Sequence, residues 1–229
     1  MATEGFFMIL KLEDLQKAAI DFHYLLNRGY PRKTSLELIG NRYDLSFDQR
    51  HLLHRGIFSD SDAVTRRKKM VSLQGLRNKK VAIDGHNMLI TIEAALSGRP
   101  LILSNDGFIR DISGLSGKFK KTRVSDKAIH LILGVLKRSK PFHVLFLFDA
   151  PISKSGLLAY GVREQLKKDH LPGDALAVRV PEKILLGFTG IVVTSDTAII
   201  DQSREVFDLA GYIIETRIKP KSLFKLKTD

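Results

Sequence analysis

The first part of the chain has the hydrophobic pattern of an amphipathic helix. Apolar residues recur every three or four positions, which places them on one helical face: Leu12, Leu15, Ala18, Ala19, Phe22, Leu25 and Leu26. Gly29 followed by Pro31 is a signal that ends a helix. The pattern therefore predicts a helix that ends just before residue 29.

A helical hairpin is predicted next, over residues 34–55. Thr34 and Glu37 have the spacing of a capping box, and Ser46 and Gln49 repeat it. The hairpin has about the length of a helix-turn-helix, whose second helix would bring four side chains to a groove: Arg50, His51, His54 and Arg55. The alternative is a packed helical bundle with these residues on its surface. We favour the bundle, because most short hairpins with one apolar stripe are simply packed.

From residue 81 the pattern changes to that of buried strands. Val81-Ala-Ile83, residues 144–148 and Ile191-Val-Val193 are short, almost continuous apolar runs. Such runs are typical of parallel strands that are covered on both faces. Further elements are predicted from weaker patterns: shorter strands at 101–103, 177–180 and 212–214, and helices at 128–136, 156–168 and 198–209. The alternation indicates an α/β domain with a mostly parallel central sheet.

Two basic segments, residues 66–69 and 77–80, flank a stretch with little periodicity. We place a domain boundary there. The prediction is a small all-helical domain over residues 1–75 and an α/β domain over residues 76–229 with a basic C-terminal tail.

Composition and charge narrow the function classes. The 229 residues are 44% hydrophobic and 27% charged, which is ordinary for a folded protein. There is no cysteine, which excludes disulfides, zinc–thiolate sites and cysteine nucleophiles. No apolar run reaches the roughly 18 residues of a membrane span, so we expect no membrane partner and a cytoplasmic location. The net charge of +12, most of it from the second domain, points to nucleic acid as the partner.

An aspartate follows each of the three clearest strands. Asp84 follows Val-Ala-Ile, Asp149 follows Leu-Phe-Leu-Phe, and Asp196 follows Val-Val-Thr-Ser. The carboxyl ends of parallel strands share one edge of the sheet, so these side chains are expected to meet there. Converging carboxylates repel one another, and Mg²⁺ or Mn²⁺, which prefer oxygen ligands, would offset that repulsion. An aspartate after a strand can also be a plain loop residue or a helix cap.

Other acids are weaker candidates. Glu182 follows a predicted strand, and Asp201 lies five residues beyond Asp196. Asp106 and Asp111 bracket a turn, where we expect a turn acid and a surface pair with Arg110.

Several short motifs resemble those of PIN-like nucleases. Asp84-Gly-His-Asn87 is similar to a motif of the NYN branch, and Thr194-Ser-Asp196 to one near the end of PIN domains. Residues 79–156, with Phe148-Asp-Ala-Pro151 and then Lys154, resemble the N-terminal half of flap endonucleases. The likeness covers roughly residues 79–215. The chain is also similar to an uncharacterised archaeal family that joins a helical domain to such a PIN-like domain.

The resemblance implies a three-layer PIN-like fold and an Mg²⁺- or Mn²⁺-dependent endo- or exonuclease. By position it assigns five metal-binding acids, the last of them the weakest: Asp84, Asp149, Glu182, Asp196 and Asp201. Asn87 would orient Asp84 or a bound water, with Ser195 as a second supporting residue. The chain departs from flap endonucleases, because Glu182 is followed by a lysine rather than by a second nearby glutamate. A catalytically inactive, nucleic-acid-binding or regulatory protein is therefore the alternative.

Basic residues of the second domain are candidates for contacts with phosphates. They fall in three places: Lys118, Lys120, Lys121 and Arg123; Lys154 and Ser155; and Lys167 and Lys168. Lysines also suit helix ends, where the macrodipole favours them, and the serine also suits a helix cap. We expect RNA to be slightly favoured over DNA, and the sequence leaves a homo-oligomer open.

Overall fold

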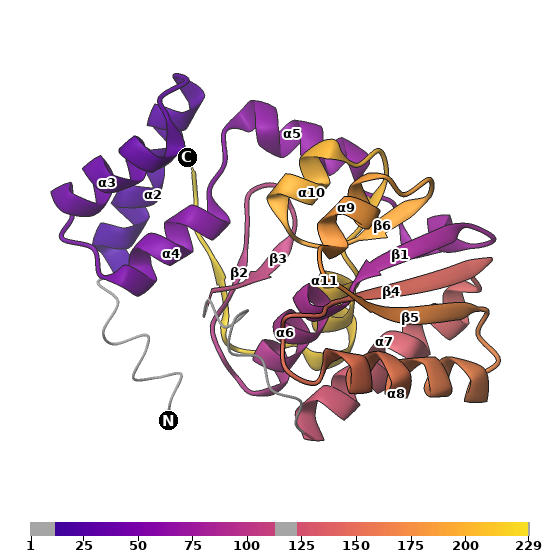
Figure 1. Cartoon of the computed structure of the whole chain (residues 1–229). Helices are drawn as coiled ribbons and strands as arrows, with labels where there is room; N and C mark the ends of the chain where they lie inside the picture. The colour runs from indigo at the N-terminus through magenta and orange to yellow at the C-terminus, as the bar shows by residue number, and fades with distance from the viewer. Residues whose placement is uncertain (1–11, 113–122, 229) are drawn as a thin grey trace. The chain divides into compact units, whose positions relative to one another are not determined.

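The structure is a computed structural model that describes residues 12–112 and 123–228 (Figure 1). The chain folds as two compact units. The first comprises residues 12–68, 98–112 and 220–228 of the described chain, and the second comprises residues 69–97 and 123–219. The structure thus differs from the predicted division at residue 75, because two segments from beyond that point return to the first unit. No helix of the described ranges has both the length and the hydropathy of a membrane span.

The helices of the first unit are α2 (Leu12–Asn27), α3 (Arg32–Arg42), α4 (Phe47–Gly56) and α5 (Asp60–Lys69). The predicted stop after α2 is confirmed, since Gly29 takes the left-handed conformation with φ 78°. The predicted capping box of α4 is also confirmed: Ser46 Oγ accepts the Gln49 N–H, and Gln49 Oε1 accepts the Ser46 N–H. By contrast, α3 begins at Arg32 after Pro31 and not at Thr34.

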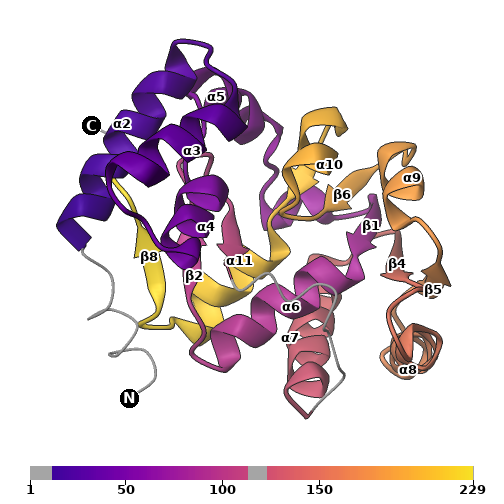
Figure 2. The ribbon, with the colours of Figure 1, turned by 60° about the vertical axis from the view of Figure 1, so that its left-hand side comes forward.

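A three-stranded sheet completes the first unit (Figure 2). β2 (Leu101–Leu103) pairs antiparallel with β3 (Ile109–Asp111) and parallel with β8 (Leu223–Lys225). The strand predicted at 101–103 is therefore confirmed, but it lies outside the large parallel sheet. Part of the expected basic tail is the strand β8.

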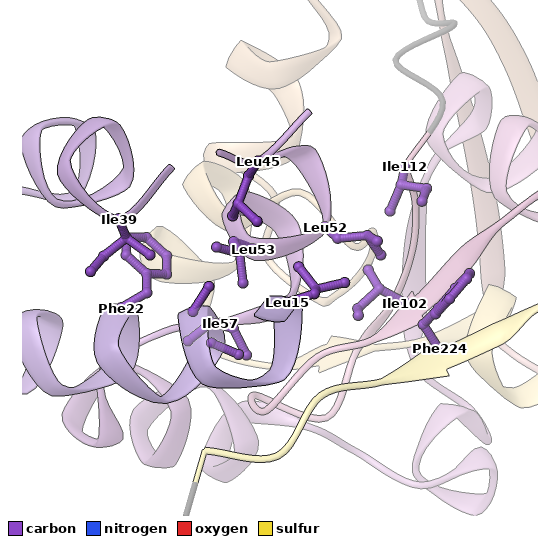
Figure 3. Close-up of a cluster of buried hydrophobic side chains, with 12 residues drawn as sticks. Leu15, Phe22, Ile39, Leu45, Leu52, Leu53, Ile57, Ile102, Ile112 and Phe224 are labelled. Atoms are coloured by element: carbon purple, nitrogen blue, oxygen red, sulfur yellow. The ribbon is translucent and has the colours of Figure 1, made fainter. Parts of the chain in front are cut away.

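One hydrophobic core joins α2, α3 and α4 to this small sheet (Figure 3). Leu15 and Phe22 of α2 and Leu52 of α4 are fully buried together with Ile102 of β2, and Phe224 of β8 is buried beside them. The sheet supplies apolar surface that the short helices need, which is why segments distant in sequence belong to this unit.

The second unit contains the predicted parallel sheet. Its strands are β1 (Lys80–Asp84), β4 (His143–Asp149), β5 (Gly173–Val178), β6 (Ile191–Val193) and β7 (Val206–Phe207). All neighbours are parallel, in the order β5-β4-β1-β6-β7. The α/β class and the three clearest predicted strands, β1, β4 and β6, are confirmed.

Helices cover both faces of this sheet (Figure 1). They are α6 (Gly85–Leu96), α7 (Arg123–Ser139), α8 (Ser155–Lys168), α9 (Pro181–Leu186), α10 (Thr197–Gln202) and α11 (Leu209–Ile213), with the 3₁₀ turn η1 (Leu73–Leu76) and the π-helix η3 (Ile214–Ile218). Leu185 of α9 and Ile199 of α10 pack on Ala82, Leu147 and Val192 of the strands. Two-residue alternation along each strand puts the residues that end β1 and β4 on this same face.

The strand predicted at 212–214 is wrong, and the helix predicted at 198–209 is interrupted by β7. Residues 209–213 form α11, because Asp208 caps its start by accepting the Gly211 N–H at 2.8 Å. Leu209, Ala210 and Ile213 are buried at helical spacing. A short apolar run did not distinguish a strand from a buried helix here.

Candidate active site

The topology brings three of the predicted acids to one edge of the parallel sheet. Asp84 ends the central strand β1, Asp149 ends β4 on one side, and Asp196 follows β6 on the other. From β1 the chain builds outward through β4 and β5, then crosses to the other side for β6 and β7. The reversal of strand order lies between β1 and β6, where a crevice opens in parallel sheets of this kind.

Asp84 is the best-defined side chain of this edge. Its Oδ2 accepts the Thr194 hydroxyl at 3.0 Å, and its Oδ1 accepts the Asn87 backbone N–H at 3.3 Å. Burial raises the pKa of Asp84 to about 7, and the charges of Asp149 and Asp196 raise it further while the two hydrogen bonds oppose the shift. Asp149 and Asp196 are therefore close enough to act on Asp84 electrostatically.

Thr194 connects two of these acids and was missed as a site residue. Its buried Oγ1 donates to Asp84 and accepts the Asp196 N–H at 3.1 Å. The signal was present in the sequence, because a residue directly after β6 lies beside the residue that ends β1 when the two strands are parallel. Ile83 pairs with Val193, so Asp84 and Thr194 are the next neighbours.

Asn87 ties the start of α6 to the loop after β6. Its Oδ1 accepts both the backbone N–H of Ser195, at 3.0 Å, and the Ser195 hydroxyl, at 2.9 Å. Asn87 thus orients Asp84 through its backbone, whereas its side chain fixes the Thr194–Asp196 segment. Ser195, which donates both of these hydrogen bonds, is buried.

His86 lies against Asp149. Its Nδ1 is 2.9 Å from Asp149 Oδ2 and 3.0 Å from the Asp149 backbone N. An unprotonated Nδ1 accepts the backbone N–H, and a protonated Nδ1 donates to the carboxylate. The ring also meets Phe148 edge-on at 5.3 Å. Either way, His86 is buried and positions Asp149, whose side chain is 32% exposed.

Gly85 allows α6 to start directly at the strand edge. A Cβ at this position would overlap the Phe148 ring and lie 2.9 Å from the Leu147 carbonyl oxygen. The glycine therefore lets β1 and β4 carry Asp84 and Asp149 side by side.

Asp196 is exposed and caps α10. Its Oδ1 accepts the backbone N–H groups of Ala198, at 2.8 Å, and Ile199, at 3.4 Å. The loop or capping role that we weighed for such an aspartate is thus present, alongside its proximity to Asp84.

The two remaining predicted acids, Glu182 and Asp201, are both exposed. Glu182 is exposed in the first turn of α9, which follows the edge strand β5, two strand positions from β1. Asp201 is exposed in the last turn of α10. Its neighbour Gln202 lines a pocket with Lys80, the first residue of β1, so the end of α10 lies toward the opposite edge of the sheet.

The predicted phosphate-contacting residues lie in several separate places along the chain. Lys118, Lys120 and Lys121 lie outside the described residues, and Arg123 is exposed at the start of α7. Lys154 is exposed just before α8. Ser155 is buried and its hydroxyl donates to the Ile152 carbonyl at 2.7 Å, which is a structural role.

Lys167 and Lys168 end α8, about 20 Å along the helix from Lys154. Because α8 leads from the end of β4 to the start of β5, these two lysines lie toward the edge opposite Asp149. Lys167 pairs with Glu164 at 2.8 Å.

The basic side chains of the predicted hairpin take part in packing. The Arg50 guanidinium donates to the Leu45 carbonyl and the Asn41 side chain, and it occupies the space where a side chain at residue 40 would lie. His51 packs against Phe47 at 4.5 Å. These contacts fit the packed-bundle alternative.

The chemistry of the acids suits a hard cation, but their arrangement is open. In the two described stretches, no set of three or more histidine, aspartate or glutamate side chains is placed to hold a metal ion. Asp84 has hydrogen bonds on both oxygens, Asp149 is half-buried, and Asp196 is exposed. A cation held by Asp84, Asp149 and Asp196 together would therefore require their side chains to rearrange.

Comparison with known proteins places the chain in a family. The model described as "Domain of unknown function (DUF5616)" matches residues 73–212, most of the second unit and more than half of the chain. The chain belongs to the DUF5616 family. A second model, "Protein of unknown function (DUF434)", matches residues 14–69 of this DUF5616 protein.

A relative with the same extent is the "Uncharacterized protein MJ0935" of Methanocaldococcus jannaschii. It is 36% identical over 203 residues, which cover 88% of this chain and 97% of the relative. This archaeal relative and the two matched regions confirm an N-terminal domain joined to a C-terminal one, and neither family model is a PIN-like nuclease family. No solved structure matches this DUF5616 protein.

Proposed function

We propose that this protein is a divalent-cation-dependent nuclease with a PIN-like second unit that hydrolyses phosphodiester bonds of RNA or DNA. The observation that carries the proposal is the position of Asp84 between Asp149 and Asp196 at the topological switch point. Ligands of open parallel sheets bind in this crevice.

Electrostatics supports a cation at this edge. Asp149 and Asp196 act on Asp84 in the direction that disfavours its ionised form. Like charges a few ångströms apart in a partly buried site repel by several kcal/mol unless a counter-ion is present. The described residues set no lysine or arginine against Asp84, whose hydrogen bonds come from Thr194 and Asn87.

Asp84, Asp149 and Asp196 would hold Mg²⁺ or Mn²⁺, which would activate a water and shield the charge of the substrate phosphate. Thr194 keeps one oxygen of Asp84 in place, and Asn87 holds the loop that carries Asp196. His86, which is buried, sets the position of the Asp149 carboxylate.

The test is cleavage of end-labelled RNA and DNA, single-stranded and flapped, with Mn²⁺, with Mg²⁺ and with chelator. Asp196→Asn is the sharpest variant, because asparagine also caps helices well and the change removes charge while keeping the cap of α10. Loss of cation-dependent cleavage in this variant is expected. Asp48→Asn, at an exposed aspartate in the first turn of α4, is the matched control and should cleave normally.

Full cleavage by Asp196→Asn, or cleavage that chelator does not affect, would contradict the site. Cleavage of only one polymer by the unmodified protein would identify the substrate.

A second candidate is a nucleic-acid-binding protein without turnover. The open arrangement of the acids favours it, since no three-residue metal-holding group exists in the described chain. The raised pKa of Asp84 favours it as well, because a carboxyl with a pKa of about 7 is partly protonated at neutral pH and binds a cation less well. This alternative predicts salt-dependent binding of RNA or DNA with no cleavage under any cation.

A further inference from the structure

Three arginines of the first unit converge on one buried aromatic ring. The Cζ atoms of Arg32, Arg66 and Arg110 lie 4.4, 4.3 and 5.0 Å from the centroid of the Phe58 ring. They come from the start of α3, from α5 and from β3. A ring stabilises a guanidinium over its face, but it does not neutralise the charge.

Asp106 is the carboxylate at the centre of this cluster. It is fully buried and accepts both terminal nitrogens of Arg110 at 2.8 Å, and Arg66 approaches it at 3.3 Å. The expectation of a surface pair with Arg110 was therefore wrong, since Arg110 is 2% exposed and the pair belongs to the interior. The Ser104 hydroxyl also donates a hydrogen bond to Asp106 Oδ1, at 2.5 Å.

Arg32 stands on the outer side of the cluster and is partly exposed. Its guanidinium donates to the His54 carbonyl in the last turn of α4. Within the part of the chain that the structure describes, no carboxylate forms an ion pair with Arg32.

The field at Arg32 is positive. After burial, the next largest influences on its pKa are repulsion from Arg66 and then Arg110, which exceed the attraction of Asp62 and Asp106. Together they lower the pKa of Arg32 to about 10, so the group remains charged at neutral pH. An anion beside Arg32 would replace this net repulsion with attraction.

We propose that Arg32 forms an anion site in the first unit that takes a phosphate group. The flat guanidinium presents its donors in the geometry of a phosphate edge. Arg66 and Arg110, anchored on Asp106 behind it, add a field that attracts the anion. The phosphate can come from free phosphate or from the backbone of a nucleic acid, because both present the same oxyanion.

The first probe is inorganic phosphate, compared with chloride at equal ionic strength, with binding followed by calorimetry and by the thermal unfolding midpoint of the full chain. Arg32→Gln should weaken phosphate binding at least about tenfold, the value of one charge-assisted hydrogen bond. Arg28→Gln is the matched control, because Arg28 stacks on Tyr24 at 4.9 Å in the same unit but lies outside the cluster. It should bind phosphate like the unmodified protein.

A second variant separates anion binding from a purely structural role of Arg32. Asp62 is exposed in the first turn of α5, and its negative charge attracts Arg32. This attraction would compete with that of a bound phosphate. Asp62→Asn should therefore strengthen phosphate binding, by about threefold for the loss of one nearby screened charge. A structural role alone predicts no gain.

The source of the phosphate is decided by a parallel titration with a single-stranded oligonucleotide. Binding of both ligands, weakened together by Arg32→Gln, assigns the site to a nucleic-acid backbone, and a loss confined to inorganic phosphate assigns it to the free ion. The proposal is overturned if phosphate binds no better than chloride, if Arg32→Gln binds it unchanged, or if Asp62→Asn binds it no more tightly.

Discussion

Replacing Asp84 by asparagine should make the protein more stable at alkaline pH. The pKa of Asp84 is about 7 in the folded chain against an ordinary value of 3.8. Between these two pH values the unfolded chain has released this proton and the folded chain has kept it. The free energy of unfolding therefore falls as pH rises from about 4 to about 7, and the loss is complete above that range.

The magnitude follows from the width of that interval. Each pH unit of difference corresponds to about 1.4 kcal/mol, so the ionised carboxyl lowers stability by at most about 4 kcal/mol above pH 7. The Thr194 hydroxyl and the Asn87 N–H donate to different oxygens of Asp84, and in asparagine one of these oxygens becomes an NH₂ group that cannot accept. The lost hydrogen bond reduces the gain by about 1 kcal/mol. We therefore expect Asp84→Asn to gain about 3 kcal/mol at pH 8.5 and less than about 1 kcal/mol at pH 5.

Urea denaturation of both proteins at these two pH values, in chelator, measures the effect directly. The control is Asp48→Asn, which should change stability by no more than about 0.5 kcal/mol at either pH, as expected of a surface substitution. The reasoning is refuted if Asp84→Asn loses stability at pH 8.5, or if its effect is the same at both pH values.

Four further substitutions test the fold around and beyond the site. Gly85→Ala should destabilise the protein by about 1–3 kcal/mol, because the added Cβ overlaps the Phe148 ring. Gly134→Ala should stabilise it by up to about 1 kcal/mol, because a Cβ at this position of α7 meets open space. Urea denaturation of both variants measures the two effects. Asp106→Asn should cost about 3–5 kcal/mol, because it leaves buried arginine charge without its carboxylate, and an unchanged midpoint of thermal unfolding would contradict this. Ser46→Ala should cost about 1 kcal/mol through loss of the capping box, read from the same unfolding curves; no loss would mean that the cap adds nothing.

Much of the second unit was predictable because its strands are buried on both faces. Residues 81–83, 144–148 and 191–193 have the continuous apolar character that such strands require, and all three lie in the parallel sheet. The short elements were harder to predict, because a short apolar run fits a strand and a buried helix equally well. Residues 212–214 are apolar enough for a strand, but the cap by Asp208 and the buried helical face decide for α11.

The division into units was not predictable from local pattern. Residues 98–112 and 220–228 belong to the first unit because Ile102 and Phe224 complete its hydrophobic core. That contribution depends on contacts between segments far apart in sequence, such as Phe58 with Asn105, 47 residues apart, and Gln16 with Lys227, 211 residues apart, which periodicity and charge do not reveal. The same holds for Asp106 and Arg110, whose spacing is that of a surface turn and whose burial comes from tertiary packing.

At the candidate site, the sequence predicts that Asp84, Asp149 and Asp196 approach one another, because parallel strands end at one edge. It does not predict how Asp84 is held. Thr194 and Asn87 reach it through the register of β1 with β6 and through the first turn of α6, and both depend on exact geometry. Glu182 follows the border strand β5 on a helix that packs back over β1 and β4, so its position relative to Asp84 depends on the course of α9 and not on strand order alone.

Burial of Asp84 also connects stability with function. At neutral pH an asparagine would fit the same space and avoid the repulsion from Asp149 and Asp196, so the aspartate lowers the stability of the protein without a bound ligand. Such a cost is characteristic of groups whose task is to bind or react, because a ligand that neutralises the charge restores the lost free energy. Mn²⁺ should therefore raise the unfolding midpoint of the unmodified protein at pH 8 and leave that of Asp84→Asn unchanged. An equal rise in both proteins would show that the cation binds elsewhere. The stability lost through Asp84 would then have no connection with the proposed binding of a cation.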